Sequence, residues 1–471
     1  MKTYDLIVIG SGSGGLTSAY TGLGFGKKVL VVDKELPGGE CTWSGCIPSK
    51  ALINEAKKVY SAKKLVGDFE YDTTKAMNRV KDVIAKVYEG ESVDKLGEDG
   101  IEFLQGHARF VSPKEILVNG QTYSAKKYII STGSSPFIPP IRGIKDVPIL
   151  DNASLFKLNK LPDSVIILGA GAIGTEMAQT MNRLGVEVHL VEMSDRILAR
   201  EEAEFSQRLE YILADEGVLI HTSTKALSIE NSEDGVVLSV EKAGKKASII
   251  AKALLVATGR QPNVEGLGLE EAGVDYDDKK IHVNAYMQTS QKHIYAVGDV
   301  VGSYQFSHAA NVEGIQAVQN SLSPIKRKVK DKHMAWVTFT QPEFARAGLL
   351  ESEAREKYGE SIRVYTFDFD HLDRAVTKGR FLDIDTASDI NEGVKIILSA
   401  KGKVLGASIL ADRAGEMIGE IQVIKTLNHN FSKLSKVIHP YPTYSEVFNK
   451  IGKKVAIDNI LGHPLVKLFR K

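Results

Sequence analysis

A glycine-rich pattern, G-x-G-x-x-G, occurs twice in this chain, each time between an apolar strand and a helix. In the first copy, Gly10, Gly12 and Gly15 follow the apolar residues 6–9 and precede a helix expected from Leu16 onward. One such pattern is weak evidence, because glycines also close ordinary turns. The strand before it and the helix after it are what give the pattern weight.

The second copy repeats the same order of elements further along the chain. Gly169, Gly171 and Gly174 follow an apolar strand at residues 165–168 and lead into a helix expected to run through Leu184. A repeated strand–glycine–helix unit is the strongest constraint on the fold, because short buried strands that alternate with helices form parallel sheets.

An acidic residue ends the next strand of each copy. Asp33 follows residues 29–32 and Glu192 follows residues 188–191, each 23 positions after the first glycine. In dinucleotide-binding units the glycines allow a tight turn, a close pyrophosphate and close helix packing, and free amides at the helix start bind phosphate. The acid accepts hydrogen bonds from a ribose. A carboxylate at Glu192 also repels a 2′-phosphate, which favours NADH over NADPH.

Each copy has a later strand that ends in Thr-Gly. These pairs are Thr132-Gly133 and Thr258-Gly259, and Arg260 follows the second one. The sequence therefore predicts an α/β fold with two Rossmann-like dinucleotide-binding domains for two different dinucleotides. With 471 residues the chain has room for a third domain, at about 150 residues per domain.

Charge and hydropathy exclude several kinds of partner. The 60 basic and 59 acidic residues nearly balance, so nothing favours a nucleic acid or an anionic membrane. The first apolar stretch, residues 6–9, is too short for a signal peptide, and no run reaches the roughly 18 apolar residues of a membrane span. We expect a cytoplasmic protein.

The only two cysteines lie in one loop, at positions 41 and 46. In a regular helix, residues five positions apart are roughly 8–9 Å from each other, too far for a disulfide. The segment after Cys41 must therefore leave the helical path, and Gly45 makes that possible. A thiolate near a helix start is stabilised by the amides and the dipole. Lys50, four positions after Cys46, places an ammonium on the same helix face.

Three interpretations of this pair remain open from the residues alone. Two buried, inert thiols would serve only packing. A zinc site needs four ligands, and residues 38–50 contain neither a histidine nor a second cysteine pair, so no metal ligands are expected. A redox-active pair fits a large chain with one close cysteine pair best.

Taken together, these motifs resemble the class I pyridine nucleotide-disulfide oxidoreductases, which include dihydrolipoamide dehydrogenase, glutathione reductase and mercuric reductase. Both glycine units, the GGxCxxxGCxPSK loop and a flavin motif at residues 289–299 carry the resemblance. It implies an FAD-binding domain at residues 1–150 and 280–330, an NAD(P)-binding domain at 151–279, and a C-terminal α+β dimerisation domain at 335–471.

The resemblance also implies roles for the residues of the cysteine loop. Cys46 would be the charge-transfer thiol that faces the flavin, and Cys41 the interchange thiol that faces the substrate. Lys50 would lie beside flavin N5 and pair with Glu176. FAD would bind the first unit and NADH the second, with NADPH less favoured.

The remaining cofactor contacts follow by the same resemblance. Asp299 would bind the ribitol, Ser307 and His308 would lie close to the isoalloxazine, and Ala108 would contact the adenosine. The expected FAD-binding set is Gly10, Gly12, Gly15, Asp33, Lys34, Gly39, Lys50, Ala108, Thr132, Gly133, Asp299, Ser307 and His308. The expected NAD-binding set is Gly169, Gly171, Ala172, Ile173, Gly174, Glu192, Gly259 and Arg260.

The chain departs from the family at one catalytic position. Members that handle dithiols use a His-Pro-Thr-x-Ser-Glu pattern from the partner subunit, and residues 439–446 place Tyr441 where that histidine stands. A tyrosine with a pKa near 10 is a poor base at neutral pH, whereas a histidine near 6.5 is a good one. Tyr441 and Glu446 of a partner chain would shape the cleft. His439 is either a displaced base or a packed interface histidine.

These observations predict a homodimeric, FAD-dependent oxidoreductase with shared active sites. Electrons would pass from NADH through the flavin and the Cys41–Cys46 disulfide to a small electrophilic or disulfide acceptor: a metal ion, a small disulfide or a quinone. The site resembles that of mercuric reductase, which also has a tyrosine at this position. Mercuric reductases carry a pair of adjacent cysteines near the C-terminus, and this chain has none. A true dihydrolipoamide dehydrogenase and a redox sensor without turnover are the alternatives.

Overall fold

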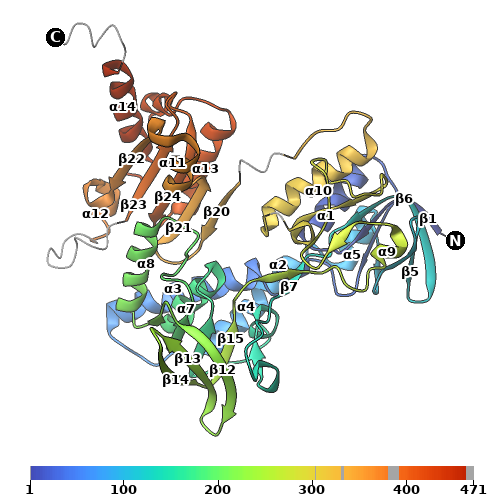
Figure 1. Ribbon diagram of the computed structural model, residues 1–471, viewed down its shortest axis with the longest axis horizontal. Coiled ribbons are helices and arrows are strands. Elements are labelled where there is room, and N and C mark those ends of the chain that lie inside the picture. The colour runs from blue at the N-terminus through green and yellow to red at the C-terminus, as the bar shows by residue number, and fades with distance from the viewer. Residues whose placement is uncertain (1, 303, 330–333, 380–391, 463–471) are drawn as a thin grey trace.

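The computed structural model describes residues 2–302, 304–329, 334–379 and 392–462, which form three units. Figure 1 shows a first unit at the right, a second at the bottom and a C-terminal unit at the upper left. The first two are built on parallel sheets, and the third packs helices on an antiparallel sheet. The predicted α/β class, with two Rossmann-like units and a C-terminal α+β unit, is confirmed.

The first unit has five parallel strands in the order β3-β2-β1-β6-β19. They are β1 (Lys2–Ile9), β2 (Val29–Asp33), β3 (Glu102–Gln105), β6 (Gln121–Ile130) and β19 (Ile294–Ala296). The chain therefore returns to this sheet after it has formed the second unit. The early part of β6 also pairs with an antiparallel hairpin, β4 (Arg109–Ser112) and β5 (Glu115–Val118).

The second unit repeats the arrangement. Its parallel strands run in the order β11-β10-β9-β15-β8, and β9 holds the central place that β1 holds in the first sheet. They are β8 (Ile149–Leu150), β9 (Ser164–Leu168), β10 (Glu187–Val191), β11 (Leu219–His221) and β15 (Ala253–Val256). One side carries an antiparallel meander of β12 (Lys225–Ser232), β13 (Gly235–Lys242) and β14 (Lys245–Ala251).

Two chain segments connect the parallel sheets, and they pair with each other. They are β7 (Ser134–Pro136), which leaves the first unit, and β16 (Arg260–Pro262), which returns to it. Side-chain bonds reinforce the crossing: Thr132 Oγ1 donates to the carbonyl of Asn263 at 2.8 Å. Gly133 and Gly259 both have positive φ here, +69° and +139°, where a glycine is favoured.

The C-terminal unit is a five-stranded antiparallel sheet in the order β20-β21-β24-β23-β22. Its strands are β20 (Ala335–Thr338), β21 (Glu343–Gly348), β22 (Arg363–Asp368), β23 (Gly393–Leu398) and β24 (Val404–Ala411). Its helices are α11 (Glu351–Tyr358), α12 (Asp373–Val376), α13 (Ala414–Thr426) and α14 (Glu446–Leu461). Alternate apolar residues of the sheet form a separate core with α13 and α14.

The helix that follows the cysteine loop links the units. Helix α3 (Cys46–Val66) packs beside α4 (Thr73–Tyr88), and both share one hydrophobic core with α7 (Ala172–Arg183) of the second unit. Leu52 lies in this core, and so does Phe344 of β21. Helix α3, which begins at Cys46, therefore packs in one core with side chains of the second unit and of the C-terminal unit.

The glycine loops lie at the carboxyl ends of β1 and β9, before α1 (Ser13–Gly24) and α7. A Cβ on Gly15 would lie 1.9 Å from the oxygen of Gly10, and a Cβ on Gly174 would lie 1.9 Å from that of Gly169. Such distances are impossible for a methyl group. The third glycine of each motif thus lets its helix pack directly on the turn, as the sequence predicts.

No helix among the described residues is long and apolar enough to cross a membrane.

The close packing of α7 gives a stability prediction. Gly174→Ala should lower the free energy of unfolding by about 1–3 kcal/mol, because the new methyl group must push α7 off the turn. Gly97→Ala, inside helix α5 (Val93–Asp99), meets no described atom within 4 Å and should leave stability unchanged or raise it slightly. Denaturant unfolding of both variants measures the difference; equal stabilities would contradict the packing argument.

Candidate active site

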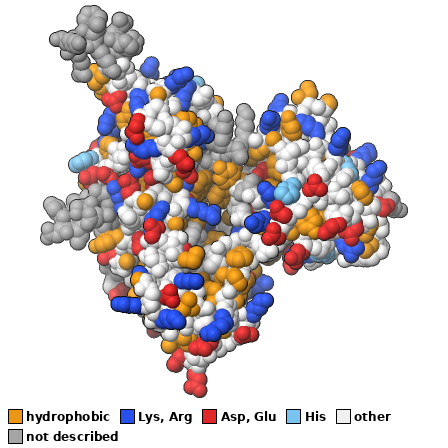
Figure 2. Space-filling model, in the orientation of Figure 1, with side chains coloured by type: hydrophobic (Ala, Val, Ile, Leu, Met, Phe, Trp, Pro, Cys, Tyr) orange, Lys and Arg blue, Asp and Glu red, His pale blue; other side chains and the backbone are white. Residues whose placement is uncertain are grey.

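A continuous cavity of 3080 Å³ runs between the two parallel sheets and reaches the C-terminal unit. It is several times larger than an ordinary ligand pocket of about 300–1,000 Å³, so it has room for two dinucleotides. Figure 2 shows hydrophobic side chains gathered in the hollow where the units meet. The residues of the predicted sets that line the cavity are Gly10, Gly12, Asp33, Lys34, Gly39, Cys41, Cys46, Lys50, Ala108, Thr132, Gly133, Gly169, Gly171, Ala172, Ile173, Glu176, Glu192, Gly259, Arg260, Asp299, Ser307 and His308.

The middle glycine of each motif faces this cavity and has no packing reason to be a glycine. A Cβ on Gly171 would meet no described heavy atom within 4 Å, and one on Gly12 would meet only the Cα of Gly39, at 3.9 Å. Within the described structure, neither α1 nor α7 has a side chain that caps its first amides. Both helix starts therefore offer free N–H groups and a close approach, which is what a pyrophosphate requires. The residues fit a dinucleotide in each unit.

The acid of each unit holds its glycine loop. Asp33 Oδ2 accepts from the amide of Ser11 at 2.6 Å and from the Ser11 hydroxyl at 2.7 Å. Glu192 Oε2 accepts from the amide of Ala170 at 2.8 Å. In both units the acid thus binds the residue that follows the first glycine. The hydrogen bond from the acid to this residue ties the end of the second strand to the turn after the first strand. The common spacing of 23 positions therefore has a structural cause besides any bond to a ribose.

The cysteine loop is broken where the sequence requires it. Helix α2 (Gly39–Trp43) ends before Ser44, and α3 begins at Cys46. Gly45 lies at the break, where a Cβ would come within 2.8 Å of the carbonyl oxygen of Glu40. Both cysteines are free thiols here; Cys41 is half-buried and Cys46 is exposed on the cavity wall. The predicted distortion of the helix between them is confirmed.

The two thiols have different acidities. The hydrogen bond from Cys41, aided by the Ser307 hydroxyl at 3.6 Å and by the charge of Lys50, lowers the pKa of Cys46 to about 6 against the opposing effect of desolvation inside the cavity. The same bond to Cys46, followed by burial, raises the pKa of Cys41 above its ordinary value. Cys46 is therefore the more acidic thiol of the pair, and Cys41 is the less acidic one.

Lys50 lies between the cysteines and the second unit. Its Nζ forms an ion pair with Glu176 Oε2 at 2.8 Å, and Nζ also lies 4.6 Å from the centre of the Phe339 ring. Glu176 is only 4% exposed, and its other oxygen accepts from the amide of Phe339 at 2.7 Å. The Lys50–Glu176 pair implied by the resemblance is present in the structure.

The remaining predicted FAD contacts lie on the opposite wall. Asp299 follows β19, and its Oδ2 accepts from the Ser134 hydroxyl at 2.5 Å. Ser307 begins helix α10 (Ser307–Leu322), and the Nε2 of His308 lies 2.8 Å from the carbonyl oxygen of Ala335. Ala108 is buried, 5% exposed, after β3. All four residues line the cavity, and Ser307 contacts Cys46 at 3.6 Å.

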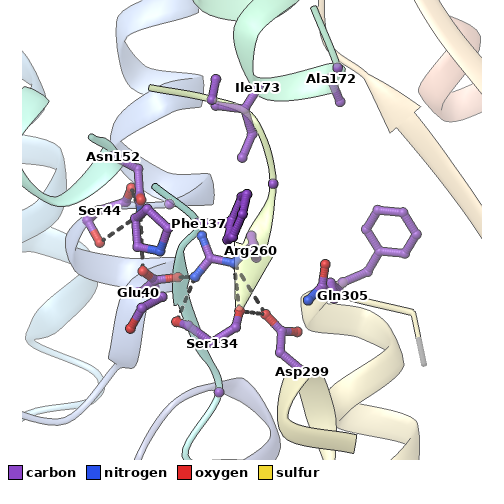
Figure 3. Close-up of a pocket in the computed structure, with 18 of the residues that line it drawn as sticks. Glu40, Ser44, Ser134, Phe137, Asn152, Ala172, Ile173, Arg260, Asp299 and Gln305 are labelled. Carbon is purple, nitrogen blue, oxygen red and sulfur yellow. Dashed lines mark hydrogen bonds and ion pairs between the residues drawn. The ribbon is translucent and has the colours of Figure 1, made fainter. Parts of the chain in front are cut away.

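A polar network that the sequence analysis did not find borders the cysteine loop. Figure 3 shows Glu40 between Arg260 and Asn152, with Ser134 and Asp299 on the far side of the guanidinium. The only sequence signal was a charged residue directly before Cys41. The partners of that residue, Glu40, are far away in the sequence, so its position before Cys41 does not indicate which side chains it binds.

The residues expected from a partner subunit do not line the cavity. Tyr441 is 70% exposed, and its hydroxyl donates to Asp373 Oδ2 at 2.8 Å. That bond raises the pKa of Tyr441. Glu446 begins α14 and lies 3.6 Å from Lys450.

His439 is pinned within its own chain. Its side chain is 7% exposed, and Nε2 lies 3.0 Å and 3.2 Å from the two carboxylate oxygens of Glu420. Its Nδ1 is buried, and no hydrogen-bond partner for it occurs among the described residues. One ring nitrogen is bound to Glu420 and the other is buried, so neither is open to a substrate thiol within this chain, which favours a packed or interface histidine over the displaced base.

Within the described ranges no group of three or more His, Cys, Asp or Glu side chains is arranged to hold a metal ion.

Both glycine loops and a thiol pair of unequal acidity line one cavity, as expected of an electron-transfer enzyme. Comparison with known proteins agrees: residues 4–320 match the model of the pyridine nucleotide-disulphide oxidoreductases, and residues 334–451 match that family's dimerisation domain. The chain belongs to this family, whose members bind FAD and use pyridine nucleotides.

The chain is similar to relatives with different acceptors. It is 37% identical to a dihydrolipoyl dehydrogenase of Thermus scotoductus, covering 95% of this chain and 96% of that one. It is 31% identical to a mercuric reductase of Bacillus cereus, covering 96% and 71%. Among solved structures, the Cu(II) complex of the HOCl-induced flavoprotein disulfide reductase RclA from Escherichia coli has a TM-score of 0.85 at 28% identity, covering 97% and 100%.

The open approach at Gly171 can be tested separately from folding. Gly171 has φ of −72° and ψ of −173°, which an alanine adopts without strain. Gly171→Ala should therefore unfold like the wild type but bind NADH about tenfold more weakly, a loss of about 1.4 kcal/mol. Titration of the FAD-loaded protein with NADH measures this, and unchanged affinity would show that no pyrophosphate approaches this turn.

The acidity of Cys46 gives a pH prediction. Because its pKa is lowered to about 6, the thiolate persists above that pH, and alkylation of Cys46 in the reduced protein should slow as the pH falls through 6. Cys41→Ala removes the hydrogen-bond donor and should move the inflection to higher pH; Lys50→Met should move it in the same direction by less. Mass-spectrometric rates across pH check this, and an inflection near 9 in the wild type would contradict it.

Proposed function

We propose that this protein is an NADH-dependent reductase of a thiophilic metal ion, such as Hg(II) or Cu(II), and that Cys41 and Cys46 deliver the electrons. The observation that carries the proposal is the combination of a reactive thiol pair with Tyr441 at the position of the family's histidine. NADH rather than NADPH is the expected donor, because the carboxylate of Glu192 lies at the loop where a 2′-phosphate would bind.

When bound, FAD supplies a two-electron carrier between the nicotinamide and the disulfide. The chain's own residues do the rest. Gly12 and Gly171 admit the two pyrophosphates, and Lys50 brings a positive charge beside Cys46. Oxidation of the dithiol to the disulfide releases two electrons and two protons. One Hg(II) takes both electrons, or two Cu(II) ions take one each.

The tyrosine supports a metal ion over a disulfide as acceptor. Reduction of a disulfide substrate needs a base that accepts and returns the proton of the interchange thiol, here Cys41. Tyr441 stays protonated at neutral pH, because the bond to Asp373 raises its pKa. A metal ion needs no such base, because its charge displaces thiol protons directly and thiolates are the ligands that soft metals prefer.

The partner subunit belongs to the proposal. The match to the dimerisation domain supports a homodimer. In that homodimer we expect Tyr441 and Glu446 of one protomer to face Cys41 of the other. The relatives named mercuric reductase and the copper complex of the disulfide reductase RclA support the same class of acceptor.

Dihydrolipoamide dehydrogenase is the second candidate, because the relative from Thermus scotoductus carries that name and shares 37% identity over 95% of this chain. It predicts fast lipoamide reduction despite Tyr441. The redox sensor without turnover has weaker support, since the site retains every residue of the reactive loop.

A substitution at position 441 separates the two enzymes. Metal-dependent NADH oxidation by the wild type should exceed lipoamide-dependent oxidation, and Tyr441→His should raise kcat/KM for lipoamide at least about tenfold by supplying the missing base. Tyr441→Phe is the matched control, since it changes the same side chain without adding a base, and it should not raise lipoamide turnover. Steady-state rates with lipoamide, Hg(II) and Cu(II) decide; rapid lipoamide turnover by the wild type would establish the dehydrogenase instead.

A further inference from the structure

One side chain binds both ends of the cysteine loop. The Asn152 amide donates to Glu40 Oε1 at 3.2 Å and to the carbonyl oxygen of Ser44 at 3.2 Å (Figure 3). Glu40 directly precedes Cys41, and Ser44 lies two residues before Cys46. The segment that must bend for the two sulfurs to meet is thus held from one point.

A guanidinium holds the other side of Glu40. Arg260 binds Glu40 Oε2 through Nη2, which also donates to the carbonyl oxygen of Ser134 at 2.8 Å. Its Nε donates to the Ser134 hydroxyl at 2.7 Å, and the Arg260 side chain is only 14% exposed. Every bond of this cluster is therefore at least partly shielded from water, where ionic hydrogen bonds are stronger than at the surface.

The two partners of Glu40 lie near the start of the second unit and directly after its end. Asn152 begins α6 (Asn152–Leu155), just after β8, and Arg260 begins β16. We call Glu40, Asn152 and Arg260 the loop brace. It fastens the cysteine loop, which belongs to the first unit, to the segments by which the chain enters and leaves the second unit.

The brace also explains how a carboxylate is kept next to the thiols. Burial raises the pKa of Glu40, and the nearby charge of Asp299 raises it further, whereas Arg260 and the Asn152 amide oppose both effects. Asp299 Oδ2 lies 3.5 Å from Arg260 Nε, so two carboxylates share one guanidinium. Arg260 and Asn152 both stabilise the charged form of Glu40, which links the position of Glu40 to both of them.

We propose that Glu40 and Asn152 are positioning residues that hold residues 40–46 in the bent form in which Cys41 and Cys46 can bond, and so set the reduction potential of the disulfide. A disulfide requires Cα atoms about 4.4–6.8 Å apart. In the dithiol the side chain of Cys41 already forms a hydrogen bond with that of Cys46, so the braced loop holds the two sulfurs close together, whereas a free loop must be ordered first. The inference rests on the proposed redox role of the pair and adds to it the residues that tune it.

The test is thiol–disulfide equilibrium of the FAD-loaded protein with glutathione, without NADH or metal. As the Cys41–Cys46 bond forms, the bond of oxidised glutathione breaks and two glutathione thiols are released, so electrons and protons balance. Asn152→Leu keeps the shape of the side chain and removes both bonds. We expect its equilibrium constant for oxidation to fall about tenfold, which makes the potential about 30 mV less negative.

The controls separate this effect from general damage. Asn231→Leu removes one amide-to-carbonyl bond from an exposed strand, Asn231 Nδ2 to Asp146, and should leave the potential unchanged. Glu40→Gln keeps the size of the side chain but loses the ion pair with Arg260; we expect a shift in the same direction of about threefold, and this variant serves if Asn152→Leu does not fold. A potential equal to that of the wild type in both brace variants would overturn the inference. A wild-type pair that never oxidises in these buffers would instead overturn the proposed function.

Discussion

The buried carboxylate of Glu176 is the contact on which the arrangement of the site depends. One of its oxygens binds Lys50 on the helix of the cysteine loop, and the other binds the amide of Phe339 after β20. Glu176 itself lies on α7, directly behind the second glycine motif. A single side chain thus ties three units together beside the cysteine loop, and its burial makes loss of either partner costly.

The glycine motifs show why the duplicated unit constrains the rest so strongly. The first and third glycines allow backbone contacts that no other residue permits, and the middle one faces the cavity. The same division holds in both copies. Two cofactor-sized sites are therefore fixed at the carboxyl ends of two similar sheets, and β7 and β16, paired with each other, determine how those sites face one another across the cysteine loop.

The features that could be predicted from the sequence depend on neighbouring residues or on the repeated glycine motif. The strands, the glycine turns and the break at Gly45 each follow from residues within a few positions, and the structure shows them where they were expected. The loop brace could not be predicted, because Glu40 meets Asn152 and Arg260 over separations of 112 and 220 positions. Nothing local marks Asn152, and Arg260 was assigned to the nicotinamide site. Only the fold brings these three side chains together.

The C-terminal segment differs from the family at one catalytic position, because Tyr441 stands where the family has a histidine. His439 and Tyr441 both have oxygen partners in their own chain, Glu420 and Asp373, so neither is arranged as a free base. The inner thiols, by contrast, already differ in acidity without help from a partner subunit, because Cys41 donates to Cys46. A site whose nucleophile is prepared internally and whose outer base is missing suits an acceptor that binds thiolates directly.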